Sequence, residues 1–208
     1  VRTCAEAVLA RDTPLHVLIN NAGLAGSRGM TSSGFEIAFG TNHVGPFLLT
    51  SLLLDRLRES APARIVNVAS GAHYGVSGID FEAVRRPTRT ITGMREYSVS
   101  KLANVLHARE LAGRLDGTGV TTYSLHPGVI ASDIWRRVPR PARAVMKRRM
   151  DSPENGARTS VYCATAPELA DQTGLYYDEC APTQPGSAVT ASLAGELWRR
   201  SEDWVGAG

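Results

Sequence analysis

The chain has 208 residues, of which 43% are hydrophobic and 21% charged, a composition typical of one compact domain with a sizeable core. Its 23 basic and 20 acidic residues give a net charge of +3, too balanced to predict nucleic acid as a partner. Three cysteines without CxxC spacing exclude a disulfide framework and a zinc site. We therefore expect a single domain over residues 1–208, without a metal, in a reducing, cytoplasmic compartment.

The most apolar stretch, residues 47–57, is interrupted by Thr50, Ser51, Asp55 and Arg56. It is shorter than the roughly 18 apolar residues that span a bilayer, and the N-terminus carries no signal-peptide pattern. We expect no transmembrane segment.

In chain order, a helical pattern over residues 3–10 comes first. The apolar run 15–19 follows and ends at Asn20-Asn21-Ala22-Gly23, as is typical of a buried strand leaving a sheet.

The next element is a long helix. Ser33 and Glu36 have the spacing of a capping box, which predicts that a helix starts there. The helical pattern continues to Glu59, and Pro46 is expected to kink it near Asn42.

Strands and helices alternate in the rest of the chain. Further strands are predicted at residues 64–70, 120–125 and 174–178, and further helices at residues 96–115, 153–164 and 191–200. Single strands separated by helices that are long enough for crossovers predict a mostly parallel sheet covered on both faces, a doubly wound α/β fold.

One pair of residues suggests acid–base chemistry. Tyr97 and Lys101 are four residues apart on a predicted helix and so share one face. Lys101 is also one of only two lysines, against 21 arginines. A nearby cation lowers the pKa of a phenol, which is ordinarily about 10. The alternative is a surface tyrosine and lysine that happen to share a face.

Several segments together resemble the short-chain dehydrogenase/reductase family. In the family's order they are Asn20-Asn21-Ala22-Gly23, Asn42, Ser70, Tyr97 with Lys101, and Pro127-Gly128. Residues 33–36, 41–50, 125–128, 153–157 and 161–163 are similar to its retinol dehydrogenase-like branch, which includes the WW-domain oxidoreductases. The resemblance implies a Rossmann-type fold and interconversion of a small-molecule alcohol and carbonyl with NAD or NADP.

The resemblance assigns four catalytic residues. Tyr97 would be the general acid/base, and Lys101 would lower its pKa and bind the nicotinamide ribose. Ser70 would polarise the substrate carbonyl, and Asn42 would hold a water of the proton relay. Without the resemblance, Ser70 would be a strand-end serine that caps its own backbone, and Asn42 an ordinary helix residue.

The resemblance also assigns residues to the cofactor. Besides Tyr97 and Lys101 they are Asn20, Ala22, Gly23, Pro127, Gly128 and Ser132. The first three would line the adenosine side, the Pro-Gly pair would turn the chain beneath the nicotinamide, and the serine would bond its carboxamide. His126 is interpreted as a strand-end residue rather than a base.

Residues 136–149 form a basic segment, with seven basic residues in 14 positions. In the family this stretch is the substrate lid. A solvated surface is the favoured interpretation, and attraction to an anionic substrate, cofactor phosphates or a membrane is the alternative.

The sequence departs from the family at its start. Family members begin with a strand and a TGxxxGxG-like loop that binds the pyrophosphate, but here no glycine precedes Gly23. We therefore expect an N-terminally incomplete sheet that lacks its first strands, with an exposed apolar edge. Such an edge is consistent with a homo-oligomer. A non-catalytic remnant or a dinucleotide-binding or interaction module of the same fold remains the alternative function.

Overall fold

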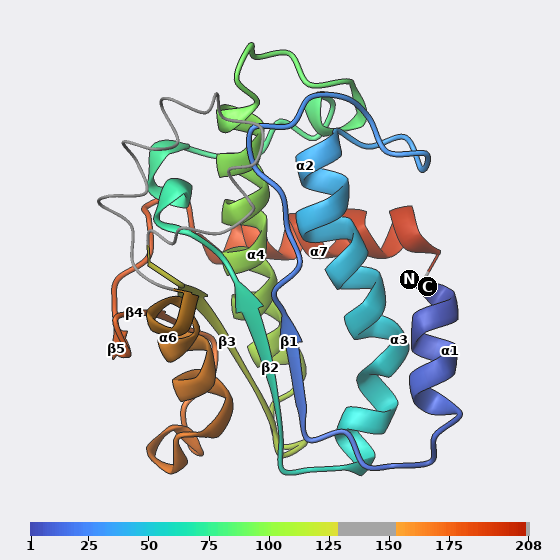
Figure 1. The fold of residues 1–208 in the computed structure, drawn as a ribbon, viewed down its shortest axis with the longest axis vertical. Helices are drawn as coiled ribbons and strands as arrows, with labels where there is room; N and C mark the ends of the chain where they lie inside the picture. Colours follow the sequence, from blue (N-terminus) through green and yellow to red (C-terminus); the bar gives the residue numbers. More distant parts are fainter. Residues whose placement is uncertain (129–152, 207–208) are drawn as a thin grey trace.

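A computed structural model describes residues 1–128 and 153–206 (Figure 1). The helices and strands are, in chain order, α1 (Arg2–Leu9), β1 (Val17–Asn20), α2 (Ile37–Phe39), α3 (Gly45–Glu59), β2 (Ala63–Val68), α4 (Met94–Arg114), β3 (Val120–His126), α6 (Pro153–Thr165), β4 (Leu175–Asp178), β5 (Ala181–Pro182) and α7 (Ala191–Val205). A π turn (Gly40–Val44) joins α2 to α3, and a 3₁₀ helix (Gly71–Gly75) follows β2. Each predicted strand and helix has a counterpart, with shifted ends.

The strands form one sheet in the order β1-β2-β3-β4-β5. Strands β1 to β4 run parallel, and β5 pairs antiparallel with β4. The interior strand β2 is rich in β-branched residues and largely buried, as expected for a parallel strand covered on both faces. The α/β, mostly parallel, Rossmann-type architecture predicted from the alternation of strands and helices is confirmed.

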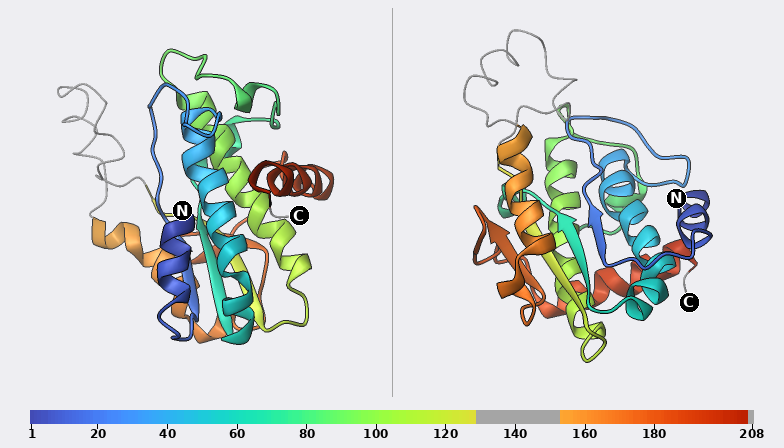
Figure 2. Two further views of the ribbon diagram at one scale, coloured as in Figure 1. Left: turned by 90° about the vertical axis from the view of Figure 1, so that its right-hand side faces the viewer. Right: turned by 60° about the horizontal axis from the view of Figure 1, so that its bottom comes forward.

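Helices cover both faces of the sheet. α3 and α4 pack on one face, with α1 against α3 and α7 against α4, while α6 packs on the other face. α6 and α7 therefore lie on opposite sides of the sheet (Figure 2). Successive side chains of β2 point to opposite faces, so Ile65 enters the larger core with Leu102 and Leu106, and Val66 enters the smaller core with Tyr123 beneath α6.

Strand β1 forms an edge of the described sheet. It pairs with β2, with Ile19 in register with Val66, and no strand of the described part pairs with its other side. Val17 and Ile19 are 37% and 40% exposed, whereas Leu18 between them packs on the larger core. This edge therefore carries the exposed apolar surface that the sequence leads us to expect.

The predicted capping box is wrong. Ser33 is exposed, and Gly34, at φ +80°, turns the chain before the helix begins. Glu36 is itself the N-cap of α2, because its carboxylate accepts the backbone N–H groups of Ala38 at 2.8 Å and Phe39 at 2.9 Å. Burial raises the pKa of the Glu36 carboxyl.

The irregularity predicted near Asn42 is a π turn rather than a proline kink. The N–H of Gly45 donates to the carbonyl of Gly40, five residues earlier. Pro46 lies in the first turn of α3, directly after the π turn. The helix therefore widens by one residue before the proline instead of bending at it.

By length and composition alone, the continuous helical stretch Ile37–Glu59 could cross a membrane. In the fold, its side chains Phe47, Leu53 and Leu57 are buried in the larger core, as in a helix that covers a sheet. The absence of a membrane-spanning segment stays a prediction.

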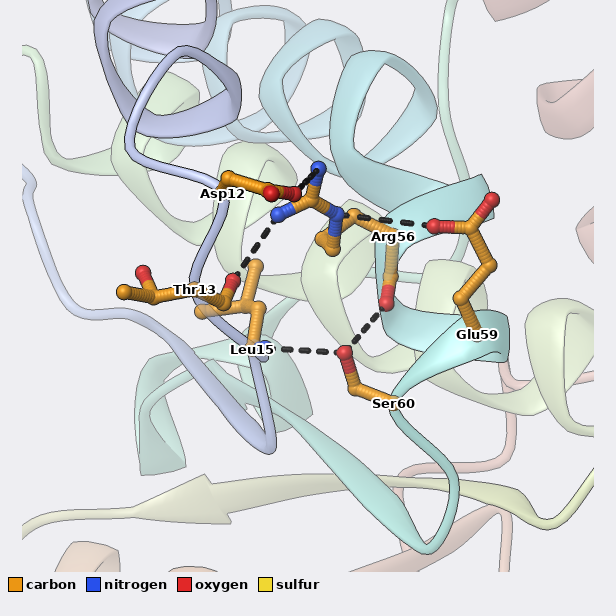
Figure 3. Close-up of polar contacts among 6 residues, drawn as sticks. All are labelled: Asp12, Thr13, Leu15, Arg56, Glu59 and Ser60. Atoms are coloured by element: carbon orange, nitrogen blue, oxygen red, sulfur yellow. Dashed lines mark hydrogen bonds and ion pairs between the residues drawn. The ribbon is translucent and has the colours of Figure 1, made fainter.

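The loop that leads into β1 is fixed to the end of α3 (Figure 3). Arg56 donates from Nη1 to the Thr13 carbonyl at 2.9 Å and lies 3.6 Å from the Asp12 carboxylate. Ser60 Oγ accepts the N–H of Leu15 at 2.9 Å and donates to the Arg56 carbonyl at 2.6 Å. Ser60 is 7% exposed, so its hydroxyl provides an acceptor where water has little access.

Replacing this hydroxyl should destabilise the fold. Ser60→Ala leaves the Leu15 N–H without its acceptor, and we expect the free energy of unfolding to fall by about 1–2 kcal/mol in urea denaturation. Among residues 1–128 and 153–206, the hydroxyl of Ser51 donates only to the Phe47 carbonyl of its own helix. Ser51→Ala is the matched control and should change stability by less than about 0.5 kcal/mol. Equal losses in the two variants would contradict the role given to Ser60.

Candidate active site

The strand ends and the N-terminal half of α4 meet at one edge of the sheet. Asn20 ends β1, Ser70 follows β2 and Pro127 follows β3. Because the three strands are parallel neighbours, their carboxyl ends share this edge, where open α/β sheets bind ligands. Tyr97 and Lys101 reach the same edge from α4.

Lys101 joins α4 to the end of β2. Its side chain is 3% exposed, and Nζ donates to the Val68 carbonyl at 2.8 Å. Asn104 donates to the same carbonyl at 3.2 Å. Burial lowers the pKa of Lys101 to about 8, because an apolar setting penalises the charged form. An ammonium has three N–H donors, and Val68 is the acceptor found for Nζ among the described residues, so Nζ keeps donors for a ligand.

Tyr97 precedes Lys101 by one helical turn. It is 6% exposed, the Ser70 side chain lies beside its phenol, and Lys101 Nζ lies over its ring, 5.6 Å from the centroid. The expected lowering of the tyrosine pKa is wrong for the chain as it stands. Burial raises the pKa of Tyr97, and the neighbouring Ser70 side chain offsets this only in part. The ammonium lies over the ring and donates to a carbonyl, so it does not overcome the cost of burying a phenolate.

Ser70 combines the two roles considered for it. Its backbone is extended, and Oγ accepts the N–H of Ala72 at 3.2 Å, which makes it the N-cap of the 3₁₀ helix. The same side chain lies beside the Tyr97 phenol, whose pKa it lowers. Capping therefore orients the hydroxyl beside the phenol.

Asn42 is fully buried in the π turn. Its Oδ1 accepts the Leu24 N–H at 2.8 Å, and Nδ2 donates to the Leu24 carbonyl at 3.0 Å and to Ser100 Oγ at 2.9 Å. The side chain thus holds the loop after β1 against α4. A water held by Asn42 stays a prediction, and the side-chain amide is already committed to protein partners.

The structure separates the three residues predicted for the adenosine side. Asn20 is 6% exposed, and its Nδ2 donates to Thr50 at 3.0 Å and Asn67 at 2.8 Å, so its side chain joins β1 to α3 and β2. Ala22 and Gly23 are exposed at the sheet edge. These two are therefore the residues of the set that a ligand can reach.

The turn after β3 has the geometry that its residues predict. Gly128 has φ +86°, a conformation that favours glycine, and Pro127 precedes it. His126 ends the strand beside Gly71, where an added Cβ would lie 3.7 Å from the imidazole. Burial lowers the pKa of His126, and the nearby Asp178 opposes this. Ser132 and the basic segment 136–149 lie outside the described residues.

Two residues at the site are not predicted from the sequence. Ser100 accepts from Asn42 and donates to the Tyr97 carbonyl at 2.7 Å, and His73 contacts the Ser70 carbonyl through Nδ1 at 2.7 Å. Each lies within three residues of a predicted catalytic residue. That proximity is the signal that could have found them.

Comparisons with known proteins show what the chain is similar to. The family model described as short chain dehydrogenase matches residues 1–84. Human retinol dehydrogenase 12 is 43% identical over 213 residues, covering 99% of this chain and 66% of the relative. Human retinol dehydrogenase 13 is 40% identical over 217 residues, covering 99% and 65%. The chain thus spans just under two thirds of the length of these relatives.

Solved structures give the same result. A crystal structure of an uncharacterized protein from Mycobacterium paratuberculosis has a TM-score of 0.73 and 28% identity, covering 98% of this chain and 72% of that one. The RhlG/NADP active-site complex from Pseudomonas aeruginosa has a TM-score of 0.62 and 27% identity, covering 84% and 68%. With this fold, and with identities of 40–43% to retinol dehydrogenases across nearly its whole length, the chain belongs to the short-chain dehydrogenase/reductase family, in its retinol dehydrogenase-like branch.

Proposed function

We propose that the protein is an oxidoreductase that interconverts an alcohol and a carbonyl compound by hydride transfer with a nicotinamide dinucleotide. The observation that carries this proposal is the convergence of Tyr97, Ser70 and Lys101 at the carboxyl edge of the parallel sheet. The names of the relatives, retinol dehydrogenases, support an alcohol as one of the two substrate forms.

Tyr97 would exchange a proton with the substrate oxygen, and Ser70 would donate a hydrogen bond to that oxygen. The raised pKa of Tyr97 keeps the phenol protonated at neutral pH, which suits proton donation to a carbonyl during reduction. Oxidation of an alcohol needs the phenolate, so this direction should become faster as the pH rises.

The residues present fit a nicotinamide cofactor. A Cβ on Gly23 would lie 3.2 Å from Asn42 Oδ1 and 3.5 Å from Lys101 Nζ, so the glycine leaves room beside the ammonium. Lys101 would use its remaining donors on the nicotinamide ribose, a group common to NAD and NADP, and the proposal therefore includes either. When bound, the cofactor supplies or accepts the hydride. The NADP complex of a solved structure with this fold supports this class of cofactor.

Tyr97→Phe tests the acid–base role. The substitution should lower kcat by about 10²–10⁴-fold and leave NAD(P)H affinity, measured by calorimetry, largely unchanged. Tyr162→Phe, on α6, removes a phenol hydroxyl that interacts with Glu168 and is the matched control, with kcat unchanged. A Tyr97→Phe enzyme with more than about a tenth of the wild-type rate would contradict the role. Cofactor binding by a wild type without turnover would indicate a dinucleotide-binding module instead.

Lys101→Arg tests whether the site needs a compact ammonium. The guanidinium keeps the charge but is larger and planar, and the space around Nζ is limited by Val68 at 2.8 Å. We expect a loss of most activity and weaker cofactor binding, approaching the values of Lys101→Met. An arginine variant with wild-type kcat and cofactor affinity would show that charge alone suffices.

Burial of Lys101 should also make stability depend on pH. Its pKa is about 8 when folded and about 10.4 when unfolded. Between these values the unfolded state binds more protons, so this residue makes stability rise with pH. The wild type should therefore gain about 2–3 kcal/mol relative to Lys101→Met between pH 7 and pH 10 in urea denaturation. A constant difference would mean that Lys101 keeps an ordinary pKa.

A further inference from the structure

His73 forms two hydrogen bonds that together fix its protonation. Its Nε2 lies 3.0 Å from the N–H of Gly186, and its Nδ1 lies 2.7 Å from the Ser70 carbonyl. The backbone N–H can only donate, so Nε2 must accept. The carbonyl can only accept, so Nδ1 must carry the proton. The ring is therefore the neutral Nδ1–H tautomer.

Packing also fixes the orientation of this ring. His73 is 0% exposed. Its ring centroid lies 4.0 Å from that of Tyr74, and Tyr176 contacts it edge-on at 4.8 Å. A Cβ on Gly186 would come within 3.4 Å of the imidazole, so the backbone there lies directly against the ring. His73 therefore cannot rotate without breaking both bonds.

The Ser70 carbonyl is held twice by this residue. The backbone N–H of His73 donates to it at 3.2 Å, in addition to the bond from Nδ1. The side chain of the same serine ends in the hydroxyl that caps Ala72 and lies beside Tyr97. Fixing the carbonyl therefore fixes the Ser70 backbone, from which the hydroxyl projects toward the Ala72 N–H.

The segment after β5 anchors the His73 side chain through the hydrogen bond from the Gly186 N–H. Besides the Gly186 bond, Tyr74 OH donates to the Gln184 carbonyl at 2.8 Å. Residues more than 100 positions apart in the sequence are thereby joined beside the site.

We propose that His73 is a positioning residue that holds Ser70 in its place beside Tyr97, a role that rests on the proposed oxidoreductase function. His73 touches neither the phenol nor the serine hydroxyl in the hydrogen bonds found, and it acts through the Ser70 backbone. The bond that matters for the reaction is the one from Nδ1, whereas the bond to Gly186 sets the tautomer and anchors the ring.

Two variants separate these bonds. The amide nitrogen of asparagine lies two bonds from Cβ, as Nδ1 does, so His73→Asn keeps a donor for Ser70. The amide oxygen of glutamine lies three bonds from Cβ, as Nε2 does, so His73→Gln keeps an acceptor for Gly186. Each variant loses one hydrogen bond of the neutral ring, so the two are matched for stability. Tyr74→Phe removes the bond to Gln184 alone and is the control.

We expect His73→Gln to lower kcat by about 10- to 100-fold, because the hydroxyl of a displaced Ser70 is no longer in position to donate a hydrogen bond to the reacting oxygen. KM should change little. His73→Asn should retain at least about ten times the kcat of His73→Gln, and Tyr74→Phe should match the wild type. Equal losses of kcat in the two His73 variants, or a loss confined to KM, would overturn the proposal.

Two readouts need no turnover. The ring nitrogen-15 shifts of the wild type should show protonated Nδ1 and unprotonated Nε2 at pH 7, and the reverse tautomer would overturn the proposal. The backbone N–H of Ala72 donates a hydrogen bond to Ser70 Oγ. Hydrogen exchange of this N–H should be at least about tenfold faster in His73→Gln than in His73→Asn. Equal exchange would also overturn it. A wild type without turnover would contradict the proposed function, and these two measurements would still test His73.

Discussion

A buried ammonium bonded to the last carbonyl of β2 fixes helix α4 relative to the sheet. Burying a charge is costly unless it is hydrogen-bonded, so Lys101 stabilises the arrangement in which Nζ reaches Val68. Asn104 reaches the same carbonyl one turn later, and together these bonds set both the position and the rotation of α4. The place of Tyr97 at the sheet edge follows from them.

The site is therefore held mostly by backbone groups at the ends of elements. The carbonyl of Val68, the N–H of Ala72 and both backbone groups of Leu24 are bonded by side chains of the site. Each of these groups would otherwise be an unpaired end of a strand or turn. The same side chains thus satisfy the local backbone and align the reactive groups, which makes stability and chemistry hard to separate by single substitutions.

The sequence predicts the elements well where the signal is local. The apolar run before Asn20 and the helical spacing of Tyr97 and Lys101 require only periodicity, and both appear in the structure. It predicts less well where tertiary contacts decide. Glu36 replaces Ser33 as the cap because the chain turns at Gly34. The pKa of Tyr97 rises because burial, which no spacing reveals, outweighs the nearby cation. Asn20 turns inward because Thr50, 30 residues away, accepts its bond.

The π turn before α3 constrains how the length of the chain can change. It holds one more residue than an α-helical turn, and this extra residue is absorbed locally, so the helix before it and α3 after it keep their faces. Deleting one residue of Gly40–Val44 would restore regular helix and change the direction of the side chains within the turn, so Asn42 would no longer reach Leu24 and Ser100. Surface loops usually tolerate gaps between related sequences, whereas an alignment gap within these five positions should be selected against, because it would release the loop after β1 from α4.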